Sequence, residues 1–286
     1  MNSKITEVIK GITKEILVLM KTEKGNWTKP WVGVHSISNK THEYQGFNCL
    51  ILALARHKNE WQRKVWGTYK QWKDAECQVD KDQHGTTILR PQIIKGKDDK
   101  GKEKVFTTFR SFKVFNIQQC SGETHKFNSF DQPPARDIKN NKRIDKHIST
   151  LAADIRHGDS MAYYNPKSDF IGMPDQKAFK DDIYYYTTLF HELTHWTGHE
   201  KRCNRKIKCW GGKDYAFEEL VAELGASFLA NHFRIESKPR EDHIRYLNTW
   251  IKGLESHSTM LFKASSLAEK AVQFIVKNKL NLRKVA

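Results

Sequence analysis

The chain has 286 residues, of which 38% are hydrophobic and 11% aromatic, and this composition excludes an intrinsically disordered chain because a core can be buried. The length allows one large domain or two ordinary ones. Lysine and arginine (49) outnumber aspartate and glutamate (33), which gives a formal net charge of +16 and a pI near 9.5.

The excess of positive charge is uneven along the chain. Residues 1–140 carry 25 basic and 15 acidic side chains, a net of +10, whereas residues 141–286 carry 24 and 18, a net of +6. Because phosphates are the commonest dense negative charge in a cell, the first half is the better candidate for contact with nucleic acid. Solubility, or a lysine-rich source proteome, is the alternative explanation of the charge.

Neither a targeting signal nor a membrane span is recognisable. Residues 1–20 place apolar side chains at helical spacing between lysines and glutamates, which predicts an amphipathic helix rather than a signal peptide. No stretch approaches the roughly 18 apolar residues of a membrane span. The five cysteines are scattered without a CxxC pair, so neither a disulfide framework nor a thiolate zinc site is expected. We therefore expect a cytoplasmic protein that does not associate with a membrane.

The first half alternates helix and strand signals and predicts an α+β domain. After the opening helix, residues 46–55 are almost entirely apolar and are expected to form a buried helix. Residues 86–91 and 105–115 have the composition of strands. The charged, glycine-containing residues 95–104 between them are expected to form a solvated hairpin tip.

The polar segment 121–136 contains the pair Pro133-Pro134 and is predicted to be a linker. It divides the chain into a domain at 1–135 and a second domain at 136–286. The second domain is predicted to be mainly helical with a small sheet, because a hairpin at 160–174 stands among five helical patterns: 144–155, 184–199, 215–233, 243–254 and 262–279.

The strongest motif lies in the predicted helix 184–199, where the sequence reads HELTH. His191 and His195 stand four residues apart, so both imidazoles lie on one helix face and can reach one metal ion. Glu192 falls beside that ion, where it can act as a general base toward water. The motif is short enough to arise by chance on an exposed helix. Apolar neighbours favour a buried helix that shields a site: Leu189, Phe190, Leu193 and Trp196.

A third ligand is expected from the helix 215–233, because zinc held by two histidines needs one more protein ligand and leaves its fourth position to water. Glu219 and Glu223 stand one turn apart there, beside two alanines that allow close helix packing. We assign Glu219 to the metal. Glu223 is expected to accept the second ring N–H of a ligand histidine and so fix its tautomer. The alternative is that these glutamates and Glu218 are ordinary surface charges.

The predicted cofactor is one zinc ion per chain, with Zn2+ replaceable by Mn2+ or Co2+ because two histidines and a glutamate also accept those ions. His199 extends the histidine spacing by another turn, but Gly198 is expected to end the helix before it. We therefore expect His199 to cap the helix or to support a ligand, not to bind the metal.

Two long segments resemble a known family. Residues 191–205 (HELTHWTGHEKRCNR) and 215–229 (YAFEELVAELGASFL) resemble the C-terminal domain of the ArdC-type antirestriction proteins. The first half is similar to the N-terminal domain of that family at four places: residues 29–31, 44–48, 66–72 and 114–116. The resemblance covers nearly the whole chain, and the C-terminal motif is its more specific part.

The resemblance implies an N-terminal domain that binds single-stranded DNA and a zincin-like metallopeptidase domain. Members of the family travel on mobile elements and protect incoming DNA from host restriction. The peptidase half is also similar to the Spartan-type DNA-dependent proteases. One departure concerns residues 79–85, where a basic, glycine-rich turn is expected and the sequence reads VDKDQHG. Its two acids disfavour phosphate binding, and the basic hairpin 95–104 is an alternative contact.

The residues of the first half agree with this resemblance. Single-stranded nucleic acid is bound by a basic groove with aromatic side chains on which bases stack. Tryptophans and tyrosines alternate there with lysines and arginines, although most of them must be core residues in so small a domain. We predict that Trp31, Tyr44 and Tyr69 are exposed stacking residues and that Lys70 contacts DNA.

Three functions fit these features. The first is a metallopeptidase that DNA guides to an unknown protein substrate. The second is a non-catalytic protein that shields DNA and whose metal site is structural or vestigial. The third is a general peptidase whose basic charge is incidental. Glu192 argues against the second, because a structural metal site has no need of that carboxylate, and the uneven charge argues against the third.

Overall fold

The computed structural model describes most of the chain, with its elements in two compact units, Ser3 to Asp131 and Lys142 to Lys277. The described residues are 3–22, 36–40, 42–97, 103–131, 142–205, 213–235 and 244–277. Both units contain helices and strands, which confirms the predicted α+β class. The predicted boundary at residue 135 lies outside the described residues.

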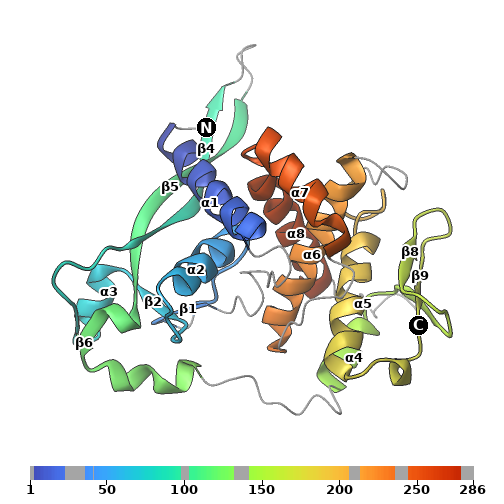
Figure 1. Cartoon of the computed structure of the whole chain (residues 1–286), viewed down its shortest axis with the longest axis horizontal. Coiled ribbons are helices and arrows are strands. Elements are labelled where there is room, and N and C mark those ends of the chain that lie inside the picture. The colour runs from blue at the N-terminus through green and yellow to red at the C-terminus, as the bar shows by residue number, and fades with distance from the viewer. Residues whose placement is uncertain are drawn as a thin grey trace. The chain divides into compact units, whose positions relative to one another are not determined.

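The N-terminal unit is built on a four-stranded sheet with the strand order β1-β2-β5-β4 (Figure 1). β1 (Ile37–Ser38) is parallel to β2 (Val65–Gly67), and β2 is antiparallel to β5. β4 (Thr86–Lys97) and β5 (Glu103–Asn116) form a long antiparallel hairpin. The two strands predicted in this region are therefore confirmed, and both extend further toward the hairpin tip.

Two predicted helices of this unit are confirmed. α1 (Ser3–Thr22) is amphipathic and buries one apolar face, whereas α2 (Phe47–Lys58) is buried on nearly every side. α3 (Tyr69–Asp74) follows β2 and begins at a capping box in which the Thr68 hydroxyl accepts from the backbone N–H of Gln71.

The predicted linker begins too early. Residues at its start belong to β6 (Cys120–Gly122), which pairs with β3 (Cys77–Val79), and to the 3₁₀ helix η2 (Thr124–Asp131). A shorter 3₁₀ helix, η1 (Ile117–Gln119), connects β5 to β6. Phe127 of η2 is buried against Trp72, so a local polar composition concealed a segment that packs on the core.

A side chain of α2 hydrogen-bonds the outer edge of β4. Asn48 of α2 donates from Nδ2 to the Leu89 carbonyl at 2.7 Å and accepts from the Leu89 backbone N–H at 2.9 Å. Its amide therefore makes the two hydrogen bonds that a neighbouring strand would make at this position.

The C-terminal unit has a three-stranded sheet with the order β7-β9-β8. The predicted hairpin is confirmed as β8 (Tyr163–Asn165) and β9 (Phe170–Met173). The predicted helix 144–155 is wrong in its second half, because α4 (Lys142–Ile148) ends early and β7 (Asp154–His157) pairs in parallel with β9. Ala152 has a φ of 52°, a left-handed conformation that cannot continue an α-helix.

Four helices follow, and α6 packs against each of the other three (Figure 1). They are α5 (Asp182–Trp196), α6 (Lys213–Phe233), α7 (Ile244–Ser256) and α8 (Met260–Lys277), preceded by the 3₁₀ helix η4 (Gln176–Ala178). The Trp250 indole of α7 donates to the Ala216 carbonyl of α6 at 2.8 Å. Within the described part of the chain, no helix is both long and apolar enough to cross a membrane.

Candidate metal centre

α5 holds the two histidines inside the protein. The helix starts at Asp181, whose carboxylate accepts from the backbone N–H of Ile183 at 2.9 Å. Nearly every residue from Ile183 to Trp196 is buried, so the helix is a core element. His191 and His195 are only 2% and 8% exposed. The alternative of a solvent-facing HExxH helix is therefore excluded.

α6 can approach α5 closely because a glycine lies at the crossing. A Cβ atom at Gly225 would lie 2.5 Å from both Oγ1 and Cγ2 of Thr194, closer than non-bonded atoms can come. Ala222 and Ala226 beside it are also buried. The small residues thus bring the glutamates of α6 within reach of the α5 histidines.

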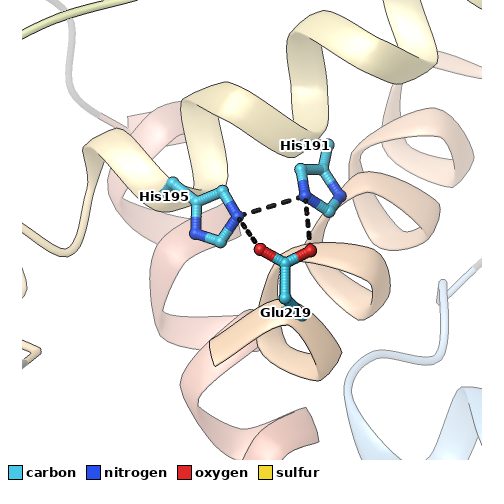
Figure 2. Close-up of side chains that lie close together, drawn as sticks. All are labelled: His191, His195 and Glu219. Atoms are coloured by element: carbon cyan, nitrogen blue, oxygen red, sulfur yellow. Dashed lines mark hydrogen bonds and ion pairs between the residues drawn. The ribbon is translucent and has the colours of Figure 1, made fainter. Parts of the chain in front are cut away.

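Three ligand-type side chains converge between the two helices. Figure 2 shows His191 and His195 projecting from one helix toward Glu219 on the other. The two Nε2 atoms lie 3.1 Å apart, and the Glu219 oxygens lie 3.3 Å from His195 Nε2 and 3.6 Å from His191 Nε2. Of the described residues, these three form the group whose ligand atoms could hold a metal ion.

This donor set fits a divalent metal. Two ring nitrogens that face each other at 3.1 Å repel if both present lone pairs, and a cation between them removes that repulsion. Nitrogens about 2.0–2.1 Å from a tetrahedral zinc ion are roughly 3.3 Å apart, close to the distances here. The buried, neutral-plus-anionic set of two imidazoles and one carboxylate matches the ligands of zinc and of neighbouring first-row metals.

The remaining ring nitrogens face two other glutamates. His195 Nδ1 lies 3.3 Å from Glu218 Oε1, within hydrogen-bond distance. His191 Nδ1 lies 3.7 Å from Glu223 Oε1, which is beyond that distance, and it has no hydrogen-bond partner in the described chain. Glu223 thus lies beside His191 without a hydrogen bond to it, whereas the carboxylate of Glu218 is placed to accept from Nδ1 of His195.

These carboxylates shift the titration of the site. Burial disfavours the charged form of His195, but its hydrogen bonds with Glu218 and Glu219 outweigh burial and raise its pKa to about 10. Burial also opposes ionisation of Glu219, yet its contacts with His191 and His195 lower its pKa well below the usual range. Both shifts favour the charged forms of His195 and Glu219.

Glu192 and His199 take different positions. Glu192 is 3% exposed and lies outside the converging ligand group, and its role as a general base stays a prediction. His199 also lies outside that group, and its Nδ1 accepts from the backbone N–H of Lys201 at 3.2 Å in the turn after α5. This contact lies within the turn and does not cap a carbonyl of α5, so a capping or supporting role for His199 stays a prediction.

Sequence reasoning missed Arg205. Its guanidinium is buried and donates to the carboxylate of Glu218, the Thr197 hydroxyl and the Thr194 carbonyl. The local sequence gives a weak signal for it, since Arg205 stands among Arg and Lys residues after the helix that look equally exposed.

The predicted DNA-contact residues differ in their exposure to solvent. Tyr69 is 50% exposed and Lys70 beside it is also exposed, at the start of α3. The Tyr69 ring packs edge-on against Phe115 with centroids 6.5 Å apart, and its hydroxyl accepts from Gln78 Nε2 at 2.8 Å. Tyr69 is therefore a fixed, accessible aromatic surface.

The expectation that Tyr44 is exposed is wrong. The side chain is only 8% exposed, and burial raises its pKa to about 12. Its backbone N–H bonds to the Ser36 carbonyl, which draws the residue onto the core beside β1. Trp31 lies outside the described residues. Trp66 and Trp72 are fully buried, in line with the expectation that most aromatic residues of this unit are core.

A helix-borne histidine pair with a carboxylate from the next helix defines a zincin-like domain, and residues 142–267 match the family model described as zincin-like metallopeptidase. Residues 6–115 match the N-terminal domain of the anti-restriction factor ArdC. The chain belongs to the ArdC family of antirestriction proteins, because the solved structure of ArdC from plasmid R388 is 30% identical, with a TM-score of 0.78. That match covers 96% of this chain and 98% of the other.

Other relatives extend these findings. A Mn(II)-bound structure of the same R388 protein is 29% identical, with a TM-score of 0.77 over 96% of this chain and 98% of that one. The uncharacterized protein y4eC of Sinorhizobium fredii is 28% identical over 94% of this chain and 92% of its own length. A DNA primase TraC of Escherichia coli is 28% identical over 93% of this chain, which spans only 26% of that primase.

Proposed function

We propose that this protein binds single-stranded DNA through its N-terminal unit and hydrolyses peptide bonds at a zinc site in its C-terminal unit, as an antirestriction factor of a mobile element. The observation that carries the peptidase half is the convergence of His191, His195 and Glu219 from two buried helices, with Glu192 next to the first ligand.

Zinc is the proposed metal, and Mn2+ or Co2+ are the proposed substitutes. The R388 relative has a Mn(II)-bound structure, and this supports the binding of a divalent cation by the present chain. Bound there, the cation would supply Lewis acidity toward a peptide carbonyl and toward water.

The chain's own residues would transfer the proton, orient the ligands and exclude water. Glu192 would accept the proton of the attacking water and pass it to the leaving amine, as a general base and then a general acid. Glu223 Oε1 lies 3.7 Å from His191 Nδ1, and this carboxylate would fix the orientation of the His191 ring. Burial of the ligands would exclude bulk water from all but the reacting position.

The N-terminal unit is proposed to hold DNA at the exposed Tyr69 ring. Lys70 and Lys113 are exposed charges for phosphates, and the Lys113 ammonium donates to the Gly85 carbonyl at 2.9 Å. A Cβ atom at Gly85 would lie 3.0 Å from both Lys113 Cβ and Phe115 Cζ, so Lys113 lies near the ring that packs against Tyr69. A stacking ring flanked by lysines is the arrangement that binds single strands without sequence preference. DNA would then concentrate protein substrates near an otherwise unselective peptidase.

Glu192→Gln tests the peptidase half. We expect the variant to keep its metal and its DNA affinity but to lose cleavage about 10²–10⁴-fold, because only the base is removed. Metal analysis, DNA binding and cleavage of a denatured protein or of the chain itself, with and without single-stranded DNA, are the measurements. Cleavage at the wild-type rate would contradict the assignment.

A transfer assay into a restricting host decides between peptidase and shield. If antirestriction requires proteolysis, Glu192→Gln fails to protect incoming DNA. Equal protection by the variant and the wild type would favour the alternative function, a non-catalytic DNA-shielding protein whose metal site is structural or vestigial.

A further inference from the structure

A buried arginine and a buried glutamate meet behind the ligand His195. Arg205 is 9% exposed and Glu218 is 5% exposed. Arg205 Nη2 donates to Glu218 Oε1 at 2.8 Å, and its Nε lies 3.2 Å from Glu218 Oε2, so both carboxylate oxygens are held by one guanidinium. A paired, two-point contact of this kind fixes the direction of the carboxylate.

Arg205 also fixes itself to the end of α5. Its Nη1 donates to the Thr197 hydroxyl at 2.8 Å and its Nη2 to the Thr194 carbonyl at 2.5 Å. The guanidinium thus joins the last turn of α5, which carries His195, to the α6 residue next to Glu219.

Glu218 and Glu219 contact opposite edges of one imidazole ring. Glu218 Oε1 lies 3.3 Å from His195 Nδ1, and Glu219 Oε1 lies 3.3 Å from His195 Nε2. A hydrogen on Nδ1 is therefore donated to Glu218, and Nε2 is directed at the group formed with His191 and Glu219. Rotation of the ring would break both contacts.

We propose that Glu218, held by Arg205, is the positioning residue for His195 at the metal centre. This inference rests on the proposed metal centre. A buried ion pair contributes little net stability, because desolvation offsets the attraction, so helix fastening alone is a weak reason for these residues. The metal-free stability and the metal affinity can be measured separately, which makes the two roles distinguishable.

The segment that follows α5 and contains Arg205 also provides a matched control. Arg202 is also held at the end of α5, where its Nε donates to the Trp196 carbonyl at 2.6 Å, but its guanidinium bonds Asp169 of the β8–β9 turn instead of Glu218. Arg202→Met should weaken the structure without altering the metal site.

The experiment measures Zn2+ affinity by chelator competition and the visible absorption of the Co2+ form, with circular dichroism to verify folding without metal. Glu218→Ala should lower Zn2+ affinity about 10–100-fold, the usual cost of losing the partner of a ligand histidine. Glu218→Gln should retain most of the affinity, because the amide oxygen still accepts from Nδ1. Arg202→Met should have the Zn2+ affinity and the Co2+ spectrum of the wild type.

The double variant Arg205→Met/Glu218→Met decides the matter even if Glu218→Ala fails to fold, because it leaves neither charge unpaired. We expect it to fold, to bind Zn2+ about 10–100-fold more weakly than wild type, and to alter the Co2+ spectrum. Wild-type affinity with an unchanged spectrum would overturn the inference and assign the pair a structural role. If the wild type itself binds no Zn2+, Mn2+ or Co2+, the proposed metal centre fails and not the positioning role alone.

Discussion

Charged side chains are buried between α5 and α6 but exposed along β4 and β5. Around the candidate metal centre, one arginine, two histidines and four glutamates are each at most 9% exposed: Arg205, His191, His195, Glu192, Glu218, Glu219 and Glu223. On the hairpin, Arg90 and Arg110 lie directly opposite each other and are both exposed. Like charges in this arrangement repel unless an anion lies between them.

This difference in burial determines over what distance the charges act. Buried charges interact strongly at short range, so their effect depends on positions within a fraction of an ångström. Exposed charges act over about 8–10 Å and are screened by salt. We therefore expect the C-terminal unit to respond to single-atom changes and the N-terminal unit to respond to ionic strength.

The largest expected effect is the loss of a metal ligand. Glu219→Ala should lower the affinity for Zn2+ more than about 100-fold, because removing even the partner of a ligand costs about 10–100-fold. Metal content after dialysis and chelator competition measure it. Lys70→Ala is the control in the exposed region and should keep full metal content. Retention of the metal by Glu219→Ala, with loss in Glu223→Ala, would mean that the third ligand is wrongly assigned.

The effect of salt on ligand affinity should distinguish the two regions almost as strongly as the loss of a metal ligand does. Single strands lose affinity with a slope of about −0.7 per phosphate contact, so about four contacts give roughly a 50-fold weaker Kd between 50 and 200 mM salt. Fluorescence anisotropy with a labelled oligonucleotide measures the Kd, and Zn2+ affinity in the same buffers should change little. Affinity for DNA that is insensitive to salt would contradict the proposed basic surface.

Tyr69→Ala should weaken binding of single-stranded DNA about 30-fold, because one stacked base contributes about 1–3 kcal/mol. The thermal midpoint should hardly change, since half of the side chain is exposed. Tyr44→Phe is the matched control, because that ring is buried and loses only its hydroxyl. A larger loss of DNA affinity in the control than in Tyr69→Ala would reverse the assignment.

The pH dependence should appear in metal binding. Since the pKa of His195 is raised to about 10, the metal must displace a proton at neutral pH. Its apparent affinity should then rise about tenfold for each pH unit between pH 7 and 9, as one proton is released. A histidine with an ordinary pKa would give a plateau above about pH 7. Competition titrations at three pH values distinguish the two curves.

Local spacing explains why the three side chains that converge at the candidate metal centre could be predicted. Two histidines four residues apart share a helix face wherever that helix lies, so the direction of His191 and His195 is a property of the sequence. Glu219 followed from the need for one more ligand and from a second helix rich in small residues. Its approach depends on Gly225, which a single sequence marks only as a glycine within a helix.

What the sequence could not predict depends on distant contacts. The helical spacing of Ile144, Ile148, Leu151 and Ile155 favours one helix, but β7 forms because its partner β9 lies beyond it in the chain. Tyr44 and Tyr69 have equally polar neighbours, and only tertiary packing buries one of them. Arg205 is 13 residues from Glu218, with no periodic relation that would pair them.

Asn48 gives the exposed hairpin a further property. β4 is an edge strand, and an open edge is a template on which a second copy can add a strand and begin to aggregate. The Asn48 amide occupies the Leu89 position of that edge and so interrupts it at a point where none of the described strands covers it. Many copies gathered on one nucleic-acid strand would stand close together, and a blunted edge would keep them from joining. Light scattering of Asn48→Ala at rising concentration would reveal the association that this side chain prevents, and a variant that stays monodisperse would show that the edge is protected in another way.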